Sequence, residues 1–272
     1  MATAILGAGV MGGTILSGLL AAGTDPMTLR VAEQRPRRQA ELSTAHPGVA
    51  VVASAAEAVA GADTVLVAVK PQDVPEVLKE IAAAVAPGAL IVSVAAGVES
   101  ATIERHLPDG HPVVRVMPNT PAAVGEGMAA LAAGRHATAE HLDRASVILS
   151  AVGKVVVVPE KYLDAVTAIS GSGPAYVMFV VEAMIDAGVM LGLPRGTATE
   201  LVVQTVFGSA KLLLATGQHP TVLRENVTSP GGTTTAALRE LEAHRVKAAF
   251  LDAMEAACRR SEELGRAQAP GA

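Results

Sequence analysis

The stretch Thr3-Ala4-Ile5-Leu6-Gly7-Ala8-Gly9-Val10-Met11-Gly12 decides the fold. Its first part predicts a short buried strand, and a helix-forming run follows the last glycine and ends at Gly23. Glycines at this spacing between a strand and a helix are typical of a dinucleotide-binding turn. Gly7 permits the tight turn, Gly9 lets a pyrophosphate approach the backbone, and Gly12 lets the helix pack on the strand. The stretch therefore predicts a Rossmann-like α/β domain.

The residues after the next predicted strand bear on the choice of cofactor. That strand, 28–32, ends at Glu33, roughly 20 residues after the last glycine, where an acidic side chain is typical of a site for the ribose hydroxyl of NAD(H). Arg35, Arg37 and Arg38 follow, and arginines there can bind the 2′-phosphate of NADP(H). For Arg37 and Arg38, the pattern favours side chains in a solvated turn. The two signals disagree, and we expect NADP(H) as cofactor, with NAD(H) also usable.

Strand and helix patterns then alternate, which predicts a doubly wound parallel sheet over a dinucleotide-binding domain, residues 1–160. The apolar run 64–69 is of the kind buried on both faces of such a sheet. Lys70 follows it at the carboxyl edge, where it is either a cofactor contact or a surface lysine. Asn119, which follows a later strand between two prolines, offers amide donors and an acceptor beside the expected nicotinamide.

Strand signals stop after Pro159, and residues 161–272 predict an all-helical second domain. The helix that begins at Arg195 has more apolar surface than one small domain can hide, which indicates self-association. The most apolar run, 174–193, carries two acidic residues near its middle. These acids favour a buried core helix over a membrane span.

A second glycine-rich stretch, Ser229-Pro230-Gly231-Gly232-Thr233-Thr234-Thr235, precedes the helix-forming run 236–241. Glycines that open a helix leave backbone N–H groups free at the positive end of the helix dipole. Such a position binds a carboxylate or a phosphate, and the threonines add hydroxyl groups there. Taken alone, the stretch is equally consistent with a glycine-rich turn capped by threonines.

Composition narrows the functional class. The chain has 272 residues and a formal net charge of −5, without a long basic run, so we expect a small-molecule substrate rather than nucleic acid. The lone cysteine, Cys258, excludes an intrachain disulfide and fits a reducing, cytoplasmic location. The first residues lack the basic segment of a signal peptide, and no span suggests a membrane partner. The histidines show no ligand spacing, so we predict no metal site.

Six motifs then carry a resemblance to one enzyme family over essentially the full chain. They are Gly7–Gly12, Ala68–Pro71, Val94–Val98, Met117–Pro121, Ser170–Tyr176 and Ser229–Thr234. With them the chain resembles a pyrroline-5-carboxylate reductase. The last two motifs are specific to that family, whereas many dehydrogenases share the glycine turn. The resemblance implies reduction of 1-pyrroline-5-carboxylate to L-proline by NAD(P)H, the last step of proline biosynthesis. It also implies a homodimer built by interlocked C-terminal helices, often assembled into a larger ring such as a decamer.

The resemblance also implies site residues. The substrate would be held by Ser229, Gly231, Gly232, Thr233 and Thr234, with the last of these nearest the ring nitrogen as the catalytic hydrogen-bond donor. Together with Arg35 and Asn119, the residues expected to contact the cofactor are Leu6, Gly7, Ala8, Gly9, Val10, Met11, Gly12, Ala68, Val69, Lys70, Pro71, Ala96 and Asn226.

The chain departs from some relatives at two places near the adenosine. Glu33-Gln34-Arg35 stands where some carry a serine that meets the 2′-phosphate, and Ala55 stands where some carry an asparagine. The first departure leaves the cofactor preference open.

Other enzyme classes share part of this pattern. Another NADP-dependent cyclic-imine reductase or a β-hydroxyacid dehydrogenase would have the same glycine turn and a helical second domain. The hydroxyacid enzymes need a catalytic lysine on a helix of that domain, and neither Lys211 nor Lys247 has the glycine-rich setting expected for it. A scaffold that binds NADP without turnover is disfavoured by the intact threonine–glycine stretch.

Overall fold

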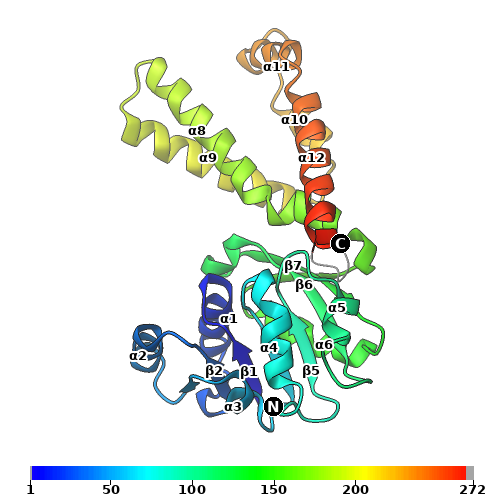
Figure 1. Ribbon diagram of the computed structural model, residues 1–272. Coiled ribbons are helices and arrows are strands. Elements are labelled where there is room, and N and C mark those ends of the chain that lie inside the picture. The colour runs from blue at the N-terminus through cyan, green and yellow to red at the C-terminus, as the bar shows by residue number, and fades with distance from the viewer. Residues whose placement is uncertain (1, 268–272) are drawn as a thin grey trace. The chain divides into compact units, whose positions relative to one another are not determined.

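The computed structural model describes residues 2–267. Within them one sheet has the strand order β3-β2-β1-β4-β5-β6-β7-β8 (Figure 1). The predicted Rossmann-like architecture is confirmed. The strands are β1 Thr3–Leu6, β2 Leu29–Ala32, β3 Ala50–Val52, β4 Thr64–Val67, β5 Leu90–Ser93, β6 Val113–Met117, β7 Gly127–Ala133 and β8 Gly153–Val157.

The sheet is parallel except at one pair. Strand β1 lies between β2 and β4, with Ile5 opposite Val31 on one side and Leu66 on the other, and all three side chains are buried. Strand β7 runs antiparallel to β6. The link between them holds only the short helix η3, Thr120–Val124, and a parallel return needs a crossover of a dozen or more residues. The predicted parallel sheet therefore carries one antiparallel step.

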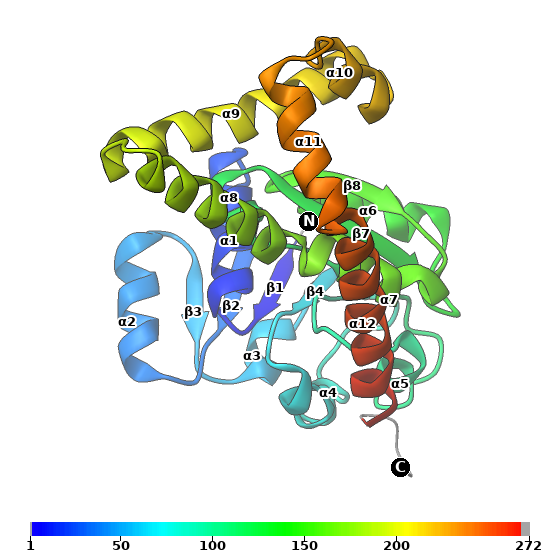
Figure 2. The same cartoon turned by 90° about the horizontal axis from the view of Figure 1, so that it is seen from above.

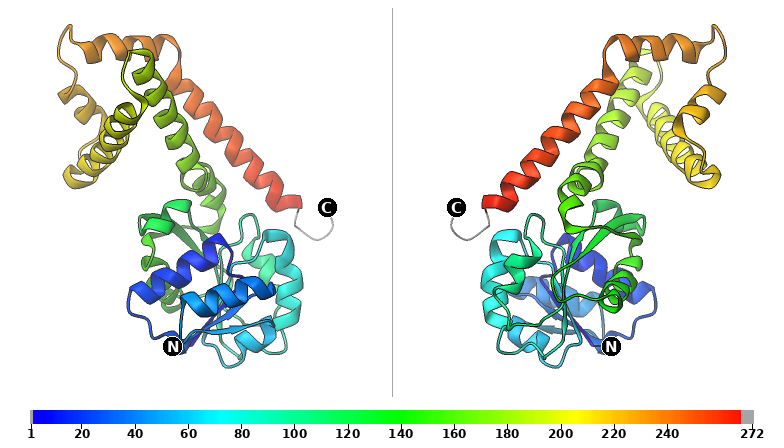
Figure 3. Two further views of the ribbon diagram at one scale, coloured as in Figure 1. Left: turned by 90° about the vertical axis from the view of Figure 1, so that its left-hand side faces the viewer. Right: turned by 90° about the vertical axis from the view of Figure 1, so that its right-hand side faces the viewer.

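Helices cover both faces of this sheet. Apolar side chains of α1, α2 and α6 pack on one face, and those of α3, α4 and α5 pack on the other. Figure 3 shows the sheet between these two groups, with the blue helices on one side and the cyan helices on the other. The helices are α1 Val10–Ala21, α2 Pro36–Ala45, α3 Ala55–Val59, α4 Val74–Ile81, α5 Ser100–Glu104, α6 Ala139–Ser150, α7 Leu163–Val166, α8 Gly173–Met190, α9 Arg195–Thr216, α10 Pro220–Asn226, α11 Thr233–Ala243 and α12 Val246–Ala267.

The described residues divide into two compact units. The first unit is residues 2–172 with 257–267, and the second unit is residues 173–256. The end of α12 thus belongs with the sheet, where the Ser261 hydroxyl donates to the Asp164 carboxylate at 2.7 Å. The domain boundary after residue 160 stays a prediction, because compactness does not test which segment folds by itself.

The second unit is helical and exposes much apolar surface. Helices α8 and α9 pack antiparallel (Figure 2). The turn between them contains Gly192, and Arg195 forms an ion pair with Asp186 at 2.9 Å. Phe179 is 72% exposed and Leu214 is 71% exposed. By length and composition, the stretches 160–190 and 195–216 could each cross a membrane. The sequence-based expectation of a buried core helix over 174–193 is wrong for the single chain, because α8 packs against α9 but none of its residues is buried among the described residues.

Candidate functional site

The glycine turn has the geometry that its spacing predicts. Gly7 has φ +91°, and its N–H donates to the Ala32 carbonyl at 2.9 Å. A Cβ placed on Gly12 would lie 2.0 Å from the Gly7 oxygen, so the helix can approach the strand only without a side chain. A Cβ on Gly9 would meet nothing within 4 Å, and this residue caps α1 without a side-chain hydrogen bond. Open space over an uncapped helix end fits a pyrophosphate.

Adjacent glycines should respond in opposite ways to alanine. We expect Gly12→Ala to destabilise the protein by about 2 kcal/mol because the added Cβ collides with backbone. Gly13→Ala should stabilise it by about 0.5–1 kcal/mol, because the nearest atom is the flexible end of Arg38 at 3.4 Å and alanine favours a helix. Thermal melting of both variants checks this. Equal melting temperatures for the two would contradict the close approach.

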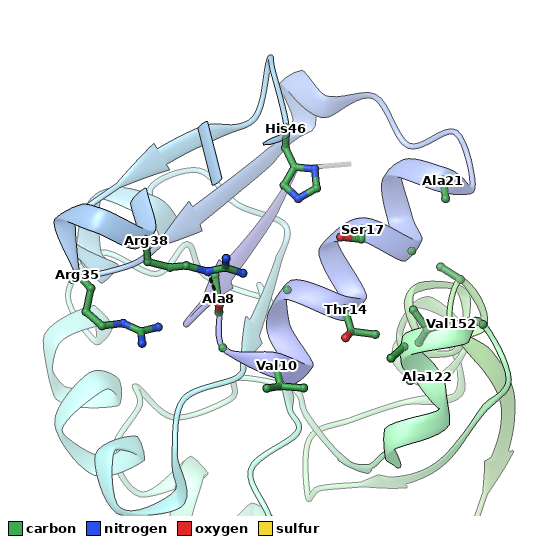
Figure 4. Close-up of a pocket in the computed structure, with 16 residues that line it drawn as sticks. Ala8, Val10, Thr14, Ser17, Ala21, Arg35, Arg38, His46, Ala122 and Val152 are labelled. Carbon is green, nitrogen blue, oxygen red and sulfur yellow. Dashed lines mark hydrogen bonds between the residues drawn. The ribbon is translucent and has the colours of Figure 1, made fainter. Parts of the chain in front are cut away.

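A pocket of about 750 Å³ begins at this turn and runs along the outer face of α1 (Figure 4). Helix α1 lies along the middle of the pocket, with Arg35, Arg38 and His46 on one side of it and η3 with the two residues that follow α6 on the other. The structure therefore brings Ala8, Gly9, Val10 and Arg35, all predicted cofactor contacts, to one hollow. His46 also lines it, although no sequence motif pointed to this residue, because its place depends on how α2 packs.

Acidic and basic groups meet at the end of β2. The Glu33 side chain is only 6% exposed and forms an ion pair with Arg35, whose Nε lies 2.9 Å from its Oε1. Hydrogen bonding to this guanidinium lowers the pKa of the Glu33 carboxyl, against the opposing effect of burial. The same pairing raises the pKa of Arg35. The carboxylate thus stays ionised and closely held.

The loops after β4 and β5 lie beside the turn at the carboxyl edge of the sheet. The Ala68 N–H donates to the Leu6 carbonyl at 2.8 Å, and Val69 approaches the position of a Cβ on Gly7 to 3.0 Å. Lys70 is exposed at this edge, as is Ala96 after β5. The predicted contacts 6–12, 68–71 and 96 therefore share one edge, and their contact with a cofactor stays a prediction.

Asn119 connects three segments of the first unit. Its Nδ2 donates to the carbonyl of Ser170 at 3.2 Å and to the hydroxyl of that residue at 3.3 Å. Its Oδ1 accepts from the Met128 N–H at 2.8 Å. Ser170 lies in the π-helix η5, Thr167–Gly171. These bonds hold the amide within the first unit, and the predicted cofactor contact of Asn119 remains a prediction.

The glycine–threonine stretch belongs to the second unit and opens α11 as predicted. Gly231 has φ +66°, and Gly232 is the N-cap residue of the helix, without a side-chain capping bond. The Thr235 hydroxyl donates to the Ser229 carbonyl at 2.7 Å, which closes the loop. Within the described residues, the hydroxyl of Thr234 forms no hydrogen bond. The backbone N–H groups of the first turn of α11 therefore have no capping side chain, and the Thr234 hydroxyl is available to a ligand.

The remaining predicted residues lie close to this loop along the chain. Thr233 is the first residue of α11, and its hydroxyl likewise has no partner among residues 2–267. Asn226 is the last residue of α10.

No group of three or more His, Cys, Asp or Glu among the described residues could hold a metal ion.

Comparisons with known proteins agree with this arrangement. Residues 160–264 match the family described as pyrroline-5-carboxylate reductase dimerisation. Residues 2–97 match the family described as NADP oxidoreductase, coenzyme F420-dependent.

Three relatives resemble the chain over almost its full length. A pyrroline-5-carboxylate reductase of Corynebacterium melassecola is 44% identical over 97% of this chain and 98% of its own. A solved pyrroline-5-carboxylate reductase of Coxiella burnetii has a TM-score of 0.92 and 36% identity, covering 96% of this chain and 97% of that one. The Plasmodium falciparum pyrroline carboxylate reductase with NADP bound has a TM-score of 0.87 and 30% identity, covering 97% of this chain and 98% of that one. The chain belongs to the pyrroline-5-carboxylate reductase family.

Proposed function

We propose that this protein reduces 1-pyrroline-5-carboxylate to L-proline with NADPH, the last step of proline biosynthesis. The observation that carries the proposal is the 44% identity to a pyrroline-5-carboxylate reductase over 97% of the chain. The open glycine turn at α1 and the glycine pair that opens α11 without a side-chain cap support the proposal, because the reaction needs a dinucleotide site and an anion site.

The first unit would hold the cofactor. The open face of Gly9 and the first N–H groups of α1 fit the pyrophosphate, and the edge formed by residues 68–71 and Ala96 fits the nicotinamide end. When bound, the reduced nicotinamide supplies a hydride. The residues of the chain would orient that ring.

The second unit would hold the substrate through its carboxylate. The backbone N–H groups that follow Gly232 point out of the start of α11, where the helix dipole favours an anion. Hydride addition to the imine carbon leaves negative charge on the ring nitrogen unless a proton reaches it. The Thr234 hydroxyl would donate a hydrogen bond to that nitrogen, directly or through a water molecule. Holding the substrate ring in the right orientation against the nicotinamide should supply most of the rate enhancement.

The protein would act as a homodimer through its helical unit. The exposed apolar faces of α8 and α9 support this, because large apolar patches mark contact surfaces, and the dimerisation family matches this part of the chain. We extend the proposal to a larger ring such as a decamer, a cytoplasmic location, and no membrane or nucleic-acid partner. The net charge of −5 supports the absence of a nucleic-acid partner, and the lone cysteine supports a reducing, cytoplasmic location. Light scattering should find no monomer at micromolar concentration.

The test is a spectrophotometric assay of NADPH oxidation with 1-pyrroline-5-carboxylate, with L-proline identified as the product. We expect turnover with this substrate and none with a β-hydroxyacid and NADP⁺. Repeating the assay with NADH gives the cofactor preference. Turnover of the hydroxyacid alone would identify a dehydrogenase, and NADPH binding without turnover of either substrate would identify a binding protein.

A further inference from the structure

Glu33 stands where an acid commonly accepts the ribose hydroxyl of NAD(H), but its carboxylate is already occupied. Its Oε1 accepts from the backbone N–H of Arg35 at 3.0 Å and from Nε at 2.9 Å, and its Oε2 accepts from Nη2 at 3.0 Å. A carboxylate has about four acceptor positions, and these bonds fill most of them. With 6% of the side chain exposed, a ribose could reach Glu33 only by displacing a charge-assisted pair.

The pairing leaves one edge of the Arg35 guanidinium available. Glu33 takes the edge that holds Nε and Nη2, so the N–H groups of Nη1 and the second hydrogen of Nη2 form the opposite edge. This side chain is 68% exposed and lines the pocket that begins at Ala8 and Gly9. A planar pair of donors at such a pocket suits a phosphate held through two hydrogen bonds.

The other two arginines differ in what they face. Arg38 lines the same pocket and donates through Nε to the Ala8 carbonyl at 3.3 Å (Figure 4). Its Nη1 donates to the Glu41 carboxylate at 3.2 Å. Arg37 is 94% exposed, pairs with Glu41 at 3.1 Å and does not line the pocket. It therefore offers a control residue with the same charge, two positions away from Arg35.

We infer that Arg35 determines the cofactor specificity of the enzyme: its free edge binds the 2′-phosphate of NADP(H), and its paired edge blocks Glu33 from the ribose hydroxyl of NAD(H). The inference rests on the proposed function, since it concerns the cofactor of that reaction. Glu33 is then a positioning residue that holds the guanidinium toward the pocket. The chain prefers NADP(H) although it carries an acid at the position typical of NAD(H) enzymes.

The experiment is calorimetric titration with NADP⁺ and with NAD⁺, without imine substrate, so that the two ligands differ only in the 2′-phosphate. The wild type should bind NADP⁺ more tightly. Arg35→Ala should weaken NADP⁺ binding about 30-fold, as expected for loss of hydrogen bonds to a charged group. The same variant should tighten NAD⁺ binding roughly threefold, because it uncovers a carboxylate that can accept from the ribose. Arg37→Ala should change neither affinity by more than about twofold.

A second variant isolates the role of the acid. Adding Glu33→Gln to Arg35→Ala should remove the gain in NAD⁺ affinity while leaving NADP⁺ binding weak. An unchanged ratio of the two affinities in Arg35→Ala, or equal binding of both cofactors by the wild type, would overturn the inference. The titrations contain no imine, so they test the inference independently of the reductase activity. A failed titration would not contradict that activity, and a missing activity would not change the titrations.

Discussion

Thr234→Ala is expected to lower kcat/KM for reduction of 1-pyrroline-5-carboxylate by on the order of 10²-fold, as for the loss of one preorganised donor at an atom that gains charge. Among the described residues, the hydroxyl of Thr234 has no hydrogen-bond partner, whereas that of Thr235 is bound to the Ser229 carbonyl at 2.7 Å. The structure thus separates Thr233 and Thr234, whose hydroxyls are available to a ligand, from Thr235, whose hydroxyl closes the loop. Steady-state kinetics with saturating NADPH would measure the effect.

Two further variants separate the hydroxyl from its surroundings. Thr234→Ser keeps the donor and should retain most of the activity. Thr235→Ala should loosen the loop by about 1 kcal/mol and raise KM more than it lowers kcat, since the lost bond is internal. Near-wild-type turnover in Thr234→Ala would remove this residue from the mechanism.

The start of the fold was predictable because its constraints are local. Gly7 has a positive φ, and Gly12 has no room for a side chain, so the positions of the glycines predict the geometry of the turn. The opening of α11 at Gly232 is of the same kind. Both depend on backbone conformation within a few residues, which composition and spacing specify.

Features that depend on distant partners were not predictable. The antiparallel strand β7 follows from a link too short for a crossover, but its pattern resembles that of any other buried strand. Asn119 bonds to Ser170, 51 residues away, and no local signal pairs them. Glu33 and Arg35 are close in sequence, yet the sequence alone suggested competing cofactor contacts rather than one joined pair. The exposure of α8 was missed because apolar composition does not tell a core from a contact surface.

Gly232→Asp should weaken binding of L-proline by on the order of 10²-fold or more, because a fixed carboxylate would take the N–H groups that the ligand needs and repel its charge. The residue is the N-cap of α11 with extended backbone at φ −76°, a position where aspartate stabilises a helix. Lost binding could not then be attributed to an unfolded helix, and circular dichroism should show the helix intact.

Gly232→Asn is the matched control for this charge effect. It has the same shape as aspartate and also caps the helix, but it carries no charge, so it should weaken proline binding less than the aspartate variant. Both side chains meet the Ser229 hydroxyl, which lies 2.5 Å from the position of an added Cβ, so their steric cost is shared. The difference between the two variants in a calorimetric titration with L-proline therefore measures the charge alone. Inhibition by L-proline that is unchanged in Gly232→Asp would show that the carboxylate binds elsewhere.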